Sequence, residues 1–174
     1  KKQLEERRNQ LGSSEQMRRA MSQMKGLESG PGEKVAKSIE QGNFGKAKDM
    51  VKQLASKMRD GTLSEKEKEQ LKKQVEQMKD ALEKAAKDHE QKKKELERQI
   101  EQARSEGRGQ DAAKLQQKLN EMQQKDSQMQ QMGQMAEAMS NAAKAMQQGD
   151  NAQASNALDQ LSEQLSDMQA EMSE

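Results

Sequence analysis

Three methionines at helical spacing are the residues of this sequence that most readily suggest chemistry. Met129, Met132 and Met135 spell Met-x-x-Met-x-x-Met. Their thioethers could hold Cu(I), because this soft ion prefers sulfur ligands. Methionine also fills irregular gaps between packed helices, and the chain contains 14 methionines, several of them at helical spacing elsewhere. We therefore expect these side chains to pack between helices, and we expect neither a bound metal nor a cofactor.

His89 is the second candidate, because it is the only histidine and lies between Asp88 and Glu90. A histidine beside carboxylates could act as a general base or bind a metal. The chain has no cysteine and no second histidine to complete such a site, so we expect His89 at the edge of a helix contact. Gly107 and Gly109 do not form a phosphate loop, since no Lys-Ser/Thr pair follows them. The sequence therefore predicts that the protein is not an enzyme.

Two long polar stretches on either side of Gly107 position these candidates. In both stretches apolar residues recur every three or four positions, which is typical of a helix with one buried face. The first stretch carries Leu71, Val75, Met78, Leu82, Ala85 and Leu96 with His89 in step, and the second carries Leu115, Leu119, Met122, Met129, Met132, Ala136, Met139, Ala143 and Met146. This mirror arrangement predicts a long antiparallel coiled-coil hairpin, with an arm over residues 64–148 and its tip at 105–110.

Folding this hairpin at Arg108 sets the register between its two helices. Leu96 then faces Leu119, and His89 faces Asp126. The outer half of the arm, from about residue 86 to residue 126, has the more polar contact line, so we expect it to be the more mobile half. We also expect a protein partner to bind along this half, and the candidate contact residues are His89, Leu96, Arg108, Leu119 and Met122.

Glycine, proline and capping residues divide the rest of the chain. We expect an N-terminal helical segment over residues 1–28, a linker over 29–33 that holds the only proline, and a helical hairpin domain over 34–174. Ser64 and Glu67 form a capping box where the first long helix starts. The fold class that follows is all-α, a long antiparallel coiled-coil hairpin braced at its base by shorter helices.

An internal repeat relates residues 35–58 to residues 142–165, which lie 107 positions later. Each copy is expected to be two helices joined by a tight Gln-Gly-Asn or Gln-Gly-Asp turn. The identical positions are Ala36, Lys37, Gln41, Gly42, Ala47, Gln53 and Leu54, which recur as Ala143, Lys144, Gln148, Gly149, Ala154, Gln160 and Leu161.

The first of these turns resembles the turn between the helices of tetratricopeptide repeats. That family uses the pattern Gly-Asp/Asn-aromatic-x-x-Ala, and the similar run here is Gln41-Gly42-Asn43-Phe44-Gly45-Lys46-Ala47. The family's Trp/Tyr and Pro positions and its tandem period are missing, so the resemblance implies a helix hairpin rather than a repeat array. The Gln/Met/Lys-rich helices also resemble low-complexity coiled-coil regions of large bacterial envelope proteins, which would imply an anchored parent protein.

Charge is nearly balanced over the whole chain, at +1, but it is unevenly distributed. Residues 1–104 hold 26 Lys or Arg and 19 Asp or Glu, whereas residues 105–174 hold 5 and 11. The two helices of the hairpin therefore attract each other, which favours pairing within one chain and equally between chains. Phe44 is the only aromatic residue, and this argues against a nucleic-acid binder, which would use aromatic stacking and a more basic surface.

These properties predict a non-catalytic structural or protein-interaction module that presents a helical arm. Its partner would be another helical protein or a second copy of the chain in a homo-oligomer. The alternative is a chaperone-like holdase that binds apolar client segments through Met-rich helical surfaces. No apolar run approaches the roughly 18 residues of a membrane span. An anchor or targeting signal could lie outside this segment, so the cytoplasm and the bacterial periplasm or envelope both stay open.

Overall fold

The computed structural model describes residues 15–24, 26–27 and 29–173. All secondary structure within these ranges is helical, so the prediction of an all-α protein is confirmed. The part of the predicted N-terminal segment that falls on residues 1–14 lies outside the described residues. A helix over residues 15–22 is followed by α2 (Pro31–Glu40), α3 (Phe44–Asp60), α4 (Glu65–Ser105), α5 (Gly109–Gln123), α6 (Asp126–Gln147) and α7 (Asn151–Ser173).

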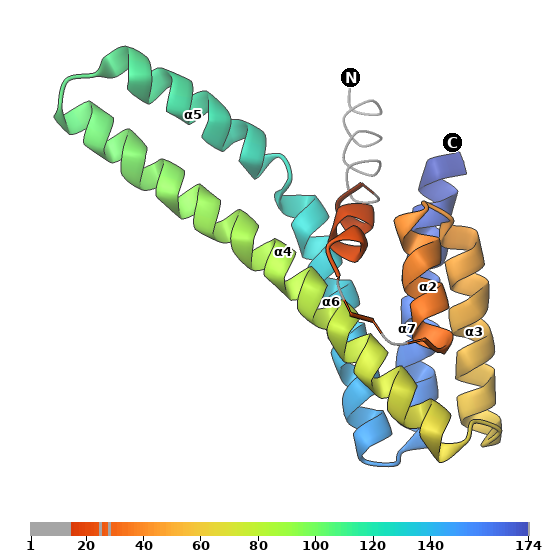
Figure 1. The fold of residues 1–174 in the computed structure, drawn as a ribbon. Helices are drawn as coiled ribbons and strands as arrows, with labels where there is room; N and C mark the ends of the chain where they lie inside the picture. The colour runs from red at the N-terminus through yellow and green to blue at the C-terminus, as the bar shows by residue number, and fades with distance from the viewer. Residues whose placement is uncertain (1–14, 25, 28, 174) are drawn as a thin grey trace.

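The base of the molecule consists of the helix over residues 15–22, α2, α3, α6, α7 and residues 65–85 of α4 (Figure 1). Within it α3 packs along α7, α7 along α6 and α6 along α4, while α2 lies against both α3 and α4. The apolar stripes of these helices face one another and form one buried cluster. Its largest fully buried side chains are Met17, Ile39, Phe44, Met58, Leu71, Met78, Leu82, Met132, Met135, Met139, Leu158 and Leu165.

The second half of α4 projects from the base together with α5, and the two helices lie side by side in opposite directions (Figure 1). Among the described helices, α4 is the only one with which α5 shares an extensive contact. Along α4 the buried cluster of the base ends at Leu82 and the half-buried Ala85. We call α5 together with residues 86–105 of α4 the outer arm.

Capping side chains and left-handed glycines explain where several of these helices begin and end. Ser64 Oγ accepts a hydrogen bond from the Glu67 amide at 3.1 Å, and the Ser64 amide donates to the Glu67 carboxylate at 3.2 Å, so the predicted capping box is present. Asn43 caps α3 through its side-chain oxygen. Gly61 and Gly107 follow helix ends with left-handed φ angles of 71° and 72°, a conformation that a β-carbon disfavours.

Two predicted boundaries differ from the structure. The sequence predicts a linker over residues 29–33, whereas α2 already begins at Pro31. Proline suits the first turn of a helix, because its missing N–H would have no partner there. The sequence also predicts a tip over residues 105–110, whereas the chain between the two helices covers only residues 106–108, because α5 begins at Gly109.

The return helix of the predicted hairpin is interrupted, which the sequence does not predict. A turn at Gln124 and Lys125, both with right-handed helical dihedrals, separates α5 from α6. Met122 and Met129 are neighbours on the predicted contact line, and Asp126 takes the position between them. Because no apolar side chain stands at this turn, packing against α4 does not hold the helix straight here.

Two glutamine side chains hold helix starts against neighbouring helices. Gln74 of α4 accepts a hydrogen bond from the Gly32 amide at 2.7 Å, and Gln169 of α7 accepts one from the Gly45 amide at 2.9 Å. Amides in the first turn of a helix have no partner within that helix, so these bonds satisfy them. A β-carbon at Gly32 would lie 2.5 Å from Gln74 Oε1, so this approach requires glycine.

Candidate functional site

The three candidate methionines lie in or against the core of the base. Met132 and Met135 are 0% and 1% exposed, while Met129 is half-buried and packs against the same cluster. Their thioethers therefore lie among apolar side chains, as their helical spacing predicts. Within the part of the chain that the structure describes, no group of three or more His, Cys, Asp or Glu side chains is placed to hold a metal ion.

His89 forms a polar cluster with Asp126 and Lys93 at the break between α5 and α6. The distance from His89 Nε2 to Asp126 Oδ1 is 2.8 Å, and the distance from Lys93 Nζ to Asp126 Oδ2 is 2.9 Å. The His89 side chain is only 7% exposed. Both carboxylate oxygens take part, so the cluster ties α4 to the first residue of α6.

The same contacts shift the protonation of Asp126 and Lys93. Burial alone would raise the pKa of Asp126, but the hydrogen bonds and charge interactions with Lys93 and His89 together lower that pKa below its usual value. The hydrogen bond to Asp126 raises the pKa of Lys93. The Asp126 carboxylate therefore stays ionised and accepts from two donors. This suits a structural contact between α4 and α6 better than the role of a general base.

The contact between α4 and α5 in the outer arm is a single narrow row of side chains. Its buried members are Ile100, Ala103, Ala112 and Leu119. Its half-buried members are Leu96, Leu115 and Met122. Packing between α4 and α5 therefore leaves part of the apolar surface of these three side chains uncovered.

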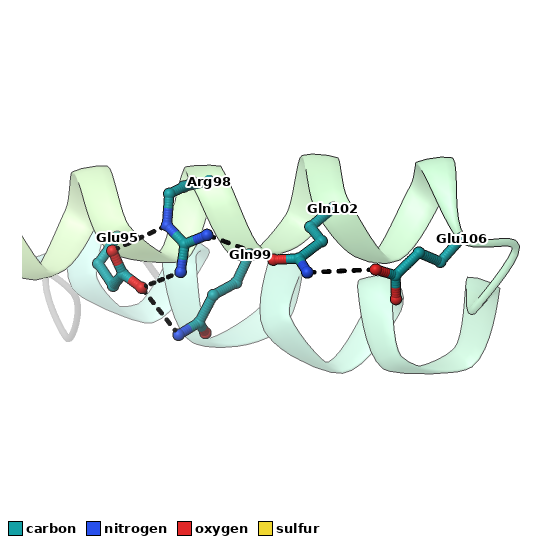
Figure 2. A network of polar contacts seen from close by, with 5 residues as sticks. All are labelled: Glu95, Arg98, Gln99, Gln102 and Glu106. Carbon is teal, nitrogen blue, oxygen red and sulfur yellow. Dashed lines mark hydrogen bonds and ion pairs between the residues drawn. The ribbon is translucent and has the colours of Figure 1, made fainter.

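One side of α4 in the outer arm carries a ladder of polar contacts (Figure 2). Arg98 donates to Glu95 at 2.6 and 3.1 Å and to Gln102 at 3.3 Å. Gln99 also donates to Glu95, and Gln102 donates to Glu106, both at 3.2 Å. The hydrogen bond from Arg98 lowers the pKa of Glu95. These contacts hold amide and carboxylate groups in a defined order along the arm.

Arg108 lies at the tip and pairs with its own neighbours. Its guanidinium group lies 2.7 Å from Glu106 and 3.6 Å from Asp111. The predicted partner-binding residues are therefore spread along the whole outer arm and do not gather at one point. His89 is at the break, Arg108 is at the tip, and between them on the contact row are Leu96, Leu119 and Met122.

Comparison with known proteins gives no assignment for this arrangement. No family model, curated protein or solved structure matches the chain. The resemblances to tetratricopeptide turns and to bacterial envelope coiled coils therefore rest on the sequence alone. Among the helices that the structure describes, none combines the length and the apolar character of a membrane span.

Lys93 is the one member of the charged cluster that is absent from the predicted candidates. It lies four residues after His89, which places both side chains on the same face of α4. The spacing therefore contained the signal. The spacing does not single out Lys93, because this residue stands in a run of three consecutive lysines, and such runs usually mark a solvated helix face.

Proposed function

We propose that this chain is a non-catalytic protein-interaction module whose outer arm binds a helical partner. The observation that carries the proposal is the half-buried row of Leu96, Leu115 and Met122 on an arm that extends beyond the core. In the base, α2, α3, α6 and α7 each pack against two other helices, whereas α5 packs extensively only against α4. A partner helix beside α4 and α5 would give the outer arm the additional neighbour that the base helices have.

In this proposal the outer arm is an antiparallel coiled-coil hairpin that becomes a three-helix bundle on binding. The contact row advances by three and four residues along both helices, which is the spacing of coiled coils. Covering a half-buried leucine or methionine contributes about 1 kcal/mol, so the row alone supports a weak and reversible association. The polar ladder from Glu95 to Glu106 adds ordered groups that lose little side-chain freedom when a partner binds.

Site-specific photocrosslinking tests this function. A benzophenone amino acid at Gln99 should crosslink to a partner in cells that produce the protein, whereas the same probe at Lys66 on the base should not. Leu96→Glu combined with Met122→Glu should abolish the Gln99 adduct, because two carboxylates would then face an apolar surface. Equal amounts of adduct from Gln99 and Lys66 would contradict the proposal. A Gln99 adduct that persists after the double substitution, in a protein whose circular dichroism is unchanged, would contradict it as well.

A holdase for unfolded clients is the second candidate function. The observation in its favour is a set of half-buried methionines, Met24, Met50, Met122, Met129 and Met146. Most of the other described methionines are buried in the core of the base, so the exposed methionine surface is small. Full suppression of the aggregation of an unrelated unfolded protein at equimolar ratio would favour the holdase function. No suppression would exclude that function.

A further inference from the structure

The two copies of the sequence repeat form two helix hairpins, α2–α3 and α6–α7. Their second helices, α3 and α7, pack side by side in opposite directions. At one end the Gly45 amide donates to Gln169 at 2.9 Å, and at the other end Arg59 lies 2.7 Å from Asp159. α4 contacts the first helix of each hairpin, α2 and α6. The two hairpins therefore share the same order of neighbours, although α4 packs more extensively on α6 than on α2.

The α6–α7 hairpin has a groove between its two helices. A hollow of about 400 Å³ is lined by the small side chains of Ala145 and Ala157. The rest of this hollow is lined by Asn141, Lys144, Gln148, Gln153, Asn156 and Gln160. The groove continues along both helices past Gln134, Glu137, Glu163 and Asp167. The only charged residue in the lining of the hollow is Lys144, whereas the continuation of the groove carries three acidic residues, Glu137, Glu163 and Asp167, and no basic one.

Larger side chains stand at the equivalent positions of the α2–α3 hairpin, and we call this surface the ridge. Ser38 and Met50 stand 107 residues before Ala145 and Ala157, and Ser38 Oγ lies 3.7 Å from Met50 Sδ. Met50 is half-buried, so part of its side chain reaches the surface. Exposed lysines occupy positions that correspond to the groove lining, namely Lys34, Lys37, Lys46 and Lys57.

The two hairpins also carry opposite net charge. Residues 31–60 hold seven Lys or Arg and four Asp or Glu, whereas residues 126–173 hold one Lys and seven Asp or Glu. One hairpin therefore presents a basic surface with an apolar centre, and the other presents an acidic surface with a hollow centre. Complementary charge of this kind speeds association and fixes the orientation of the partners.

We propose that the ridge of one copy of this chain docks in the α6–α7 groove of a second copy. Met50 enters the hollow beside Ala145 and Ala157, and the surrounding lysines lie against the acidic lining. Ridge and groove are different surfaces, so the contact is head to tail, and further copies add until a ring closes or in an open row. This contact does not depend on the outer arm, and it weakens as salt screens the charges.

A charge-swap experiment on the full chain tests this contact. Sedimentation velocity should show a mass that rises with protein concentration, more steeply at low salt than at high salt. Lys46→Glu with Lys57→Glu reverses the ridge, and Glu163→Lys with Asp167→Lys reverses the groove. Each double variant alone should self-associate about tenfold more weakly or worse. An equimolar mixture of the two should associate again, because each reversed surface then meets its complement.

Lys114→Glu with Lys118→Glu is the matched control, because it reverses two exposed lysines on α5 and should leave the self-association unchanged. Circular dichroism of every variant checks that the helices are intact. A monomer at every concentration and salt overturns the proposal. Self-association that persists in the ridge variant and in the groove variant also overturns it. Loss of self-association in Leu96→Glu with Met122→Glu would assign the contact to the outer arm instead.

Discussion

The two halves of α4 belong to one continuous helix, yet they have different surroundings. Residues 65–85 lie against α2 and α6, and the side chains of Leu71, Val75, Met78 and Leu82 are at most 3% exposed. Residues 86–105 lie mainly against α5, and only His89, Ile100 and Ala103 are buried there. Both halves are rich in charge and both are helical throughout. The comparison teaches that neighbouring helices, rather than helix propensity, determine where this molecule is stable.

The largest expected difference between the two halves comes from the same truncation at matched leucines. Leu82→Ala removes a fully buried side chain from the base and should lower the free energy of unfolding by about 3 kcal/mol. Leu96→Ala removes a half-buried side chain from the outer arm and should lower it by about 1 kcal/mol. Urea titration followed by circular dichroism measures both values. Equal losses would mean that the outer arm is packed as tightly as the base.

The next largest effect tests how closely α2 approaches the inner half of α4. Gly32→Ala would place a β-carbon 2.6 Å from Gln74 Cβ, so the helices must move apart. We expect the free energy of unfolding to fall by about 2 kcal/mol. Gly133→Ala on α6 is the control, because no atom outside its own helix backbone lies within 4 Å of the new β-carbon, and it should raise stability slightly. An unchanged free energy of unfolding in Gly32→Ala would show that α2 and α4 are not tightly packed at this point.

A smaller effect is expected at the junction of the two halves, from Asp126→Asn. The loss should be about 1 kcal/mol or less, because solvent screens a carboxylate whose side chain is 46% exposed. The folded pKa of Asp126 is lowered, so its contribution is complete above the unfolded value of about 3.9 and disappears as pH falls through the folded pKa.

Urea titrations between neutral and strongly acidic pH check this dependence. The difference in unfolding free energy between the wild type and Asp126→Asn should shrink below about pH 4. Asp111→Asn at the tip is the control, because it removes an exposed carboxylate outside this cluster and should change the free energy of unfolding less. A difference that persists or grows in acid would rule out a contribution from the ionised carboxylate.

The smallest expected effect concerns the polar ladder on the outer half. Arg98→Ala removes the hydrogen bonds to Glu95 and Gln102. Amide exchange over residues 95–106 should accelerate by only about twofold, because exposed pairs on one helix contribute little. Lys94→Ala, which lies outside the ladder, is the control for lost surface charge. A much larger change would mean that the ladder, rather than the contact row, stabilises the outer arm.

Some features of the two halves could be predicted from the sequence, because the residues that interact are separated by a fixed number of positions along one helix or across one turn. Folding the chain at Arg108 places His89 opposite Asp126, and the structure brings these side chains to 2.8 Å. The capping box at Ser64 is equally local. In both cases the residues that interact are set by helical geometry alone.

Other features could not be predicted, because they depend on how distant segments approach. The contact between Gln74 and Gly32 joins residues 42 positions apart, and no local pattern marks it. Ala145 and Ala157 read as ordinary helix residues, and they line a groove only because α6 and α7 leave that side uncovered. The charged cluster at the break before Asp126 likewise depends on Lys93, which lies on another helix, 33 positions away.

The unbroken course of α4 from the base to the tip has a mechanical consequence. Its 41 residues span about 60 Å at 1.5 Å per residue, with no hinge along the way. A tilt of about 5° at its root would therefore displace the tip by about 5 Å. The helix is a lever, and a load at the tip exerts a torque at the root, where Gln74 holds the first turn of α2. A force on the outer arm would thus strain the contact between Gln74 and the first turn of α2, one of the two helices that carry the ridge.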